Sequence, residues 1–138
     1  MNRRNFIGKT AVLSASALMP LSSFSILGQP KYKMGYQLFS VRTDMAENPL
    51  ATIKALKEMG YEDFEFYGFD ADKGLIYGYT PSELKTILDD LQLSITSGHY
   101  SFSPYLEKSD EALKHYVDQC ILAAKAIDSK YITWPYIA

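Results

Sequence analysis

The chain has 138 residues, of which 47% are hydrophobic and 22% are charged. This composition is typical of one soluble globular domain and excludes a fibrous or disordered chain. The formal net charge of -2 predicts no nucleic-acid partner, because phosphate backbones are usually bound by clustered basic faces. The single cysteine, Cys120, excludes an intramolecular disulfide and a cysteine-rich metal site.

The first thirty residues have the layout of an export signal. Arg3 and Arg4 precede a mildly apolar stretch, residues 11–19, which is followed by proline and small residues. A membrane span needs about 20 apolar residues, so no stable membrane insertion is expected after signal removal. The letters RRNFI resemble a twin-arginine motif, and a general secretory signal is the alternative. We expect residues 1–30 to be a twin-arginine-like signal peptide and residues 31–138 to form an exported, periplasmic domain.

The next segments predict a strand followed by a helix. Residues 34–41, MGYQLFSV, are rich in aromatic and branched side chains, which is typical of a strand. After a polar loop, Asn48 and Pro49 have the character of a helix cap and a first helical position. Gly60 is placed to end this helix in the left-handed conformation. Its apolar face recurs about every third residue, at Leu50, Ile53, Leu56 and Met59.

A second strand and helix follow. Residues 61–69, YEDFEFYGF, predict the strand, and Thr80 with Glu83 predicts a capping box that opens the helix, with Pro81 at its first position. The helix would bury a stripe of leucine and isoleucine side chains: Leu84, Ile87, Leu88 and Leu91.

The last segments repeat the unit. Residues 93–102 predict a third strand, which we expect Gly98 to break just before His99. Ser109 is the expected cap of a third helix, and residues 130–138, KYITWPYIA, predict a buried fourth strand. The expected inner face of the third helix comprises Leu113, Val117, Cys120, Ile121, Ala124 and Ile127.

Alternating strands and helices indicate parallel strands joined by right-handed crossovers. An open doubly wound sheet and part of a (β/α) barrel both fit this order. The turn after the first strand, SVRTDMAENP, contains no glycine, which disfavours dinucleotide binding.

In such barrels the chemistry lies where strands run into the following loops. A carboxylate, a histidine, an arginine and several aromatic rings at these positions indicate a sugar site, because rings cover the apolar faces of sugars and polar groups bind the hydroxyls. The candidate substrate-binding residues are Gln37, Arg42, Glu65, Tyr67, His99, Trp134 and Tyr136, with Asp70 and Tyr100 at further strand ends.

Two of these candidates have structural alternatives. Glu65 lies between Phe64 and Phe66, so alternation places its carboxylate on the opposite face of the strand. There it has either a functional role or a purely structural ion pair with Arg42, since a buried carboxylate needs a partner. His99 is either a ligand or a histidine satisfied within the core.

Four segments, MGYQLFSVR, ALKEMGYEDFEFYGFD, LSITSGHYSF and AAKAIDSKYITWPY, together resemble the xylose-isomerase-like TIM barrel family of sugar phosphate isomerases and epimerases. The resemblance covers residues 33–138. It implies an α/β fold that is the N-terminal half of a (β/α)8 TIM barrel, with four parallel strands and three helices. It also implies a divalent metal (Mn, Mg, Co or Zn) and movement of a proton between neighbouring carbons of a keto or aldo sugar. Glu65 and His99 match positions that face the substrate, and His99 is the one candidate metal ligand.

Most metal ligands of that family come from later strands. We therefore expect a truncated isomerase or epimerase that does not bind the metal alone. A small-molecule sugar is the expected ligand, and a second copy or the missing C-terminal half is the expected protein partner. The alternatives are a non-catalytic half-barrel that self-associates or binds carbohydrate, and a non-functional gene fragment.

Overall fold

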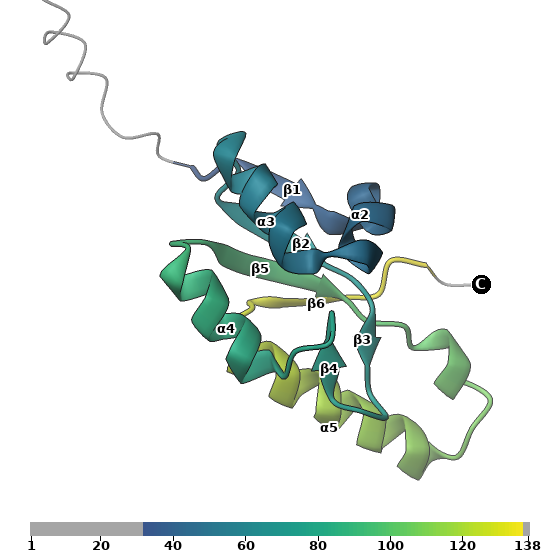
Figure 1. Cartoon of the computed structure of the whole chain (residues 1–138). Helices are drawn as coiled ribbons and strands as arrows, with labels where there is room; N and C mark the ends of the chain where they lie inside the picture. Colours follow the sequence, from purple (N-terminus) through teal and green to yellow (C-terminus); the bar gives the residue numbers. More distant parts are fainter. Residues whose placement is uncertain (1–31, 137–138) are drawn as a thin grey trace, which may run out of the picture. The chain divides into compact units, whose positions relative to one another are not determined.

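Four parallel strands form one sheet in the computed structural model, which describes residues 32–136 (Figure 1). The order in the sheet is β1 (Gly35–Gln37), β2 (Asp63–Phe66), β5 (Ser94–His99) and β6 (Tyr131–Thr133). Neighbours in the sheet therefore follow one another along the chain, as in a barrel wall, without the reversal of order that marks a doubly wound sheet. The expected α/β fold is confirmed, and it is consistent with part of a TIM barrel. The proposed signal, residues 1–30, lies outside the described residues.

Three helices begin where their caps predicted. They are α3 (Pro49–Glu58), α4 (Pro81–Asp90) and α5 (Asp110–Ala126). The side chains of Asn48, Thr80 and Ser109 each accept a hydrogen bond from a backbone N–H in the first turn, and Thr80 forms the full capping box. Gly60 follows α3 with a φ of 97°, as its placement predicted. Within residues 32–136 no helix has the length and apolarity needed to cross a membrane.

The first expected strand ends early. Strand β1 stops at Gln37, and the chain then forms a 3-10 turn, η3 (Leu38–Val41), and a short helix, α2 (Arg42–Glu47). We expected a strand up to residue 41 and a polar loop after it, and both expectations are wrong. Leu38 and Met45 are both buried, and their separation of seven residues matches two helical turns, so burial of this face outweighs the local strand propensity.

The second expected strand also stops short, at Phe66. Gly68 has a φ of 76°, and the chain turns there into a small antiparallel hairpin that the sequence did not reveal. The hairpin consists of β3 (Phe69–Asp70) and β4 (Leu75–Ile76). The hairpin places Ile76, which is completely buried, in the core beside α4.

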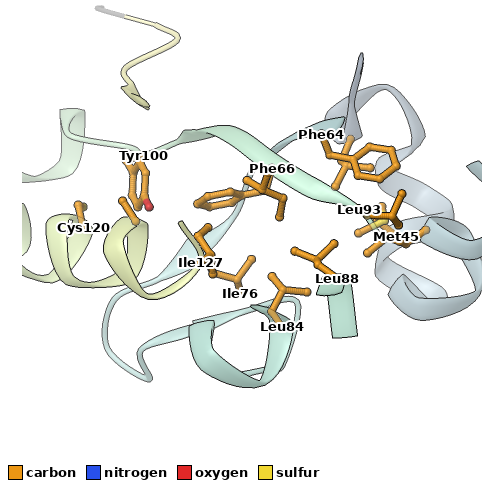
Figure 2. Packing of buried hydrophobic residues seen from close by; sticks show 14 of the residues in the cluster. Met45, Phe64, Phe66, Ile76, Leu84, Leu88, Leu93, Tyr100, Cys120 and Ile127 are labelled. Atoms are coloured by element: carbon orange, nitrogen blue, oxygen red, sulfur yellow. The ribbon is translucent and has the colours of Figure 1, made fainter. Parts of the chain in front are cut away.

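The core lies between the sheet and the helix layer, where α4 and α5 run side by side (Figures 1 and 2). Phe64 and Phe66 point into it, and Phe66 meets Tyr100 edge to face at 5.3 Å. Gly98 pairs with Phe66 in the sheet, and a methyl group built at Gly98 would lie 2.0 Å from Phe66 Cε1. The expected break at Gly98 is therefore wrong: this glycine lies within β5 and makes room for a ring.

Two expectations about the last unit also need correction. Tyr116 of α5 is buried, whereas Ile121, which was placed on the inner face, is 38% exposed. Tyr116 stacks on Tyr105 of the preceding 3-10 turn, η4 (Ser103–Tyr105), at 4.0 Å, on the buried side of the helix. Strand β6 was expected to be buried, but Tyr131 is 61% exposed because β6 has a neighbour on one side only in the described sheet.

Candidate functional site: a glutamate–histidine pair beside an aromatic cavity

Glu65 and His99 form a pair on the face of the sheet opposite the helices. Nε2 of His99 lies 2.7 Å from Oε1 of Glu65. The hydroxyl of Ser97 donates to the other carboxylate oxygen at 2.5 Å. On the far side of the imidazole, the amide nitrogen of Gln37 lies 3.3 Å from Nδ1. The side chains of His99 and Glu65 are 21% and 24% exposed, so the pair is shielded from solvent but can be reached.

An irregularity in the sheet brings these residues together. Phe64 pairs with Ile95, but the next residue of β2, Glu65, pairs with Ser97, so Thr96 is an extra residue on β5. A regular ladder would place Thr96 opposite Glu65, and the alternation of side chains would send Ser97 to the helix side. The bulge reverses that alternation and places Ser97, and with it His99, on the same face as Glu65.

Arg42 does not pair with Glu65, so that structural hypothesis is wrong. The residue lies in α2, and its guanidinium group sits 4.8 Å from the centre of the Phe39 ring and donates to the Phe39 carbonyl at 3.4 Å. The partners of Glu65 are instead His99 and Ser97. Arg42 contributes to the site through its backbone, since its carbonyl accepts a hydrogen bond from the Tyr67 hydroxyl at 3.2 Å.

A cavity of about 360 Å³ opens beside the pair, at the carboxyl ends of β5 and β6. It brings together five of the predicted strand-end residues, because its lining includes Tyr67, His99, Tyr100, Trp134 and Tyr136. Phe39, which the sequence did not single out, adds another ring and meets Tyr67 edge to face at 5.3 Å. The result is a hollow with aromatic walls and one imidazole, a surface suited to the apolar face and hydroxyls of a small ligand.

Burial disfavours ionisation of two phenol groups near this cavity, those of Tyr67 and Tyr77. Burial raises the pKa of Tyr67, and the positive charge of Arg42 opposes this only in part. Burial also raises the pKa of Tyr77, whose hydroxyl accepts a hydrogen bond from the backbone N–H of Tyr67 at 3.0 Å. Tyr77 was not predicted from the sequence, and it fixes the strand end that presents Tyr67.

Two other strand-end candidates do not join the pair. Asp70 lies in β3, where Lys73 binds its carboxylate at 3.1 Å and hydrogen bonds from Lys73 lower its pKa. Tyr100 backs the cavity, but its ring is completely buried on the helix side, near Cys120 (Figure 2). Its hydroxyl has no hydrogen-bond partner among residues 32–136, and the same holds for the buried indole N–H of Trp134.

A second polar layer lies one step below the pair on the same face. The hydroxyl of Ser94 donates to Asp63 at 2.6 Å, and the ammonium group of Lys33 donates to Ser94 at 3.0 Å. A groove of about 290 Å³ runs along this face, lined by Gly35, Tyr36, Gln37, Asp63, Phe64, Glu65, Thr96 and Ser97. The face of the sheet opposite the helices is therefore unusually polar for the wall of a barrel, where bulky branched side chains normally dominate.

The described residues do not fit a metal site by themselves. Over residues 32–136, no group of three or more histidine, cysteine, aspartate or glutamate side chains lies close enough to hold an ion. Glu65 and His99 are two potential donors, but Nε2 of the imidazole already faces the carboxylate and Nδ1 faces Gln37. Metal sites in proteins usually need three or more side-chain ligands.

Comparison with known proteins supports the fold. No protein-family model matches the sequence, and no curated protein matches it. Among solved structures, the chain is similar to the crystal structure of a sugar phosphate isomerase/epimerase from Parabacteroides distasonis ATCC 8503, with a TM-score of 0.65 and 20% sequence identity. The match covers 86% of this chain and 44% of that chain, so the chain spans less than half the length of its structural neighbour.

Proposed function

We propose that the described domain is the sugar-binding part of an isomerase or epimerase of the xylose-isomerase-like type. The observation that carries the proposal is the Glu65–His99 pair at the edge of an aromatic cavity, at the end of the sheet where barrel enzymes bind their substrates. The structural neighbour, itself a sugar phosphate isomerase/epimerase, adds support from an independent direction.

Each part of the cavity has a role in this proposal. Trp134, Tyr136 and Phe39 provide rings for the C–H face of a sugar, and the hydroxyl oxygen of Tyr67 offers an acceptor to the sugar hydroxyls. The imidazole of His99 holds the Glu65 carboxylate at the edge of the cavity. Sugar isomerases and epimerases move a proton to or from a carbon next to a carbonyl group. In that step a C–H bond breaks and a base gains the proton. The C–H electron pair forms a C=C bond to the carbonyl carbon, and the π pair of the C=O bond moves to the oxygen. The carboxylate of Glu65 is the described group suited to accept and return such a proton.

The metal expected from the family resemblance enters only as a proposal about the intact active site. When bound, a divalent ion in such enzymes stabilises negative charge on the sugar oxygens. Since the described residues do not form a site for it, we propose that they bind and orient the sugar, and that metal ligands come from outside residues 32–136.

Export remains part of the proposal. The paired arginines at positions 3 and 4 and the short apolar stretch after them support a twin-arginine route to the periplasm. A periplasmic domain would more often meet free or oxidised sugars than sugar phosphates.

The binding proposal is tested by calorimetric titration of the full chain with a panel of free aldoses, free ketoses and their phosphates. We expect saturable heat with at least one sugar, loss of that heat in Glu65→Ala, and its retention in Glu62→Ala, which removes an exposed carboxylate from the same strand region. The proposal fails if no sugar gives saturable heat while circular dichroism shows a folded chain, or if Glu65→Ala binds as tightly as the natural chain.

A second candidate function is self-association, favoured by the apolar side chains at both ends of the sheet. Met34, which directly precedes β1, is 48% exposed, and at β6 Tyr131 and Ile132 are 61% and 39% exposed. A second copy related by a twofold axis would bring β6 of one chain beside β1 of the other, and two sets of four parallel strands make the eight of a closed barrel. The Glu65–His99 site would then lie inside an enclosed barrel.

Light scattering on the full chain decides between these states. A dimer that Ile132→Lys dissociates supports self-association, provided that Leu106→Lys, which alters an exposed apolar side chain directly after η4, leaves the dimer intact. A folded monomer at every accessible concentration rejects it.

A further inference from the structure

We propose that Gln37 and Ser97 are positioning residues that hold the Glu65–His99 pair in a single proton arrangement. In this arrangement the imidazole is neutral, its proton is on Nε2, and Nδ1 is an acceptor. The use of the arrangement in proton transfer rests on the proposed function, whereas the arrangement itself follows from the hydrogen-bond geometry.

The contact with the Glu65 carboxylate determines which ring nitrogen of His99 carries the proton. An ionised carboxylate can only accept hydrogen bonds, so a nitrogen 2.7 Å from Glu65 Oε1 must carry a hydrogen. That distance is in the range of charge-assisted hydrogen bonds. Ser97 donates to the second oxygen of the same carboxylate, which stops the group from rotating and keeps Oε1 directed at His99.

On the other side of the ring, the contact between Gln37 and Nδ1 fits a neutral imidazole. An amide nitrogen is only a donor, so the Gln37 nitrogen 3.3 Å from Nδ1 requires a lone pair on that atom. A doubly protonated ring would place two donors opposite each other, and Gln37 would have to turn its amide to present oxygen instead. With the Gln37 amide in the orientation that the structure shows, the hydrogen-bond partners on both sides fit the same neutral tautomer.

In this arrangement Glu65 and His99 have different roles. The imidazole, with Nε2–H committed to Glu65 and Nδ1 to Gln37, orients the carboxylate and does not serve as the base. The carboxylate of Glu65 is the group that takes up a proton from a ligand. Gln37, which the sequence suggested as a sugar ligand, acts through His99, and its contact with Nδ1 leaves its amide oxygen and its second N–H unused.

The test is a long-range ¹H–¹⁵N nuclear magnetic resonance spectrum of the ¹⁵N-labelled full chain at neutral pH, without sugar. The chain has two histidines, and the exposed His115 on α5 serves as an internal reference whose signals are assigned with His115→Gln. We expect His99 to show the pattern of a pure Nε2–H tautomer and a slowly exchanging Nε2–H proton signal, while His115 shows the averaged pattern of a solvated ring.

Three variants distinguish positioning from a merely structural role. Gln37→Glu places a carboxylate opposite Nδ1, so the His99 pattern should change to that of the doubly protonated ring. Ser97→Ala should abolish the slowly exchanging Nε2–H signal of His99, because the Glu65 carboxylate is then no longer held in one orientation. Ser94→Ala, which removes the equivalent hydroxyl from Asp63 on the same strand, should leave that signal unchanged.

The inference is overturned if His99 carries its proton on Nδ1 or gives the averaged pattern of His115. It is also overturned if Ser97→Ala and Ser94→Ala have the same effect. Since no sugar is present, these outcomes are independent of the calorimetric test: sugar binding with the wrong tautomer rejects only this inference, and the right tautomer without sugar binding rejects only the proposed function.

Discussion

Nε2 of His99 lies 2.7 Å from Oε1 of Glu65, although the two residues belong to different strands and a regular ladder would place them on opposite faces of the sheet. The extra residue Thr96 in β5 resolves this conflict. A site of this kind depends on backbone irregularity as much as on residue type, because the bulge decides which side chains share a face.

The Glu65 carboxylate should contribute to the stability of the fold. Glu65→Ala leaves the His99 N–H and the Ser97 hydroxyl without their acceptor in a partly buried place. We expect the free energy of unfolding to fall by about 1–3 kcal/mol, the usual cost of unpaired polar groups. Urea denaturation measures the change, with the exposed Glu62→Ala as a control that should stay within about 0.5 kcal/mol of the natural chain. Equal stability of the two variants would contradict the pairing.

Gly98 should be intolerant of any side chain. The methyl group of Gly98→Ala would lie 2.0 Å from the ring of Phe66, which is itself completely buried. We expect a loss of about 3 kcal/mol of stability from this overpacking. Gly35→Ala is the matched control in β1, since its new methyl would meet only the Asp63 carbonyl at 3.7 Å.

The same contact can be tested by compensation. Phe66→Leu should recover part of the stability lost in Gly98→Ala, because a smaller side chain leaves space for the methyl group. If the stability losses of Gly98→Ala and Phe66→Leu simply add in the double variant, the contact with the Phe66 ring is not the cause of the loss in Gly98→Ala.

The capping box of α4 should make stability depend on pH at the acid end. Hydrogen bonds from the Thr80 side chain and backbone lower the pKa of Glu83 from its ordinary value of 4.5. A carboxyl group whose pKa is lower in the folded chain stabilises the fold above its unfolded pKa, and this stability is lost as the pH falls through the folded value. Thermal melts should therefore show a weaker acid loss in Glu83→Gln than in the natural chain. Glu58→Gln, which alters an exposed glutamate in α3, should leave the loss unchanged.

Export of the chain should depend on the two arginines of the proposed signal. Replacing Arg3 and Arg4 together by lysine should retain the full-length chain in the cytoplasm, since the twin-arginine route requires that pair. Cell fractionation with an antibody against the chain measures this. Continued export of the double variant would indicate a general secretory signal instead.

Much of the fold could be predicted because helix ends carry strong local signals. Asn48, Thr80 and Ser109 act as caps in the structure where the sequence placed them, and the alternation around Glu65 put Phe64 and Phe66 on the buried face. These features depend on neighbours within a few residues, so a single sequence reveals them.

The parts that could not be predicted depend on distant residues. Gly98 looked like a strand break, but its role is set by Phe66 on the next strand. Arg42 was assigned to the end of a strand, whereas burial of Leu38 and Met45 wraps that segment into helical turns and carries the guanidinium group to Phe39. Ser97 lies two residues before His99, and that spacing alone could have indicated a shared face. Its contact with Glu65 requires the bulge at Thr96, which no local pattern marks.

The most direct test of the sugar site is a titration of the ¹⁵N-labelled full chain with the sugar that gives heat in calorimetry, followed through the ring signals of His99 and the indole N–H of Trp134. Trp134 is the single tryptophan of the chain and lines the same cavity as His99, so both reporters can be assigned without ambiguity. We predict that the two sets of signals shift together and saturate at the same sugar concentration, while those of the exposed His115 stay in place. Unchanged His99 and Trp134 signals at saturating sugar would contradict a sugar site at this cavity.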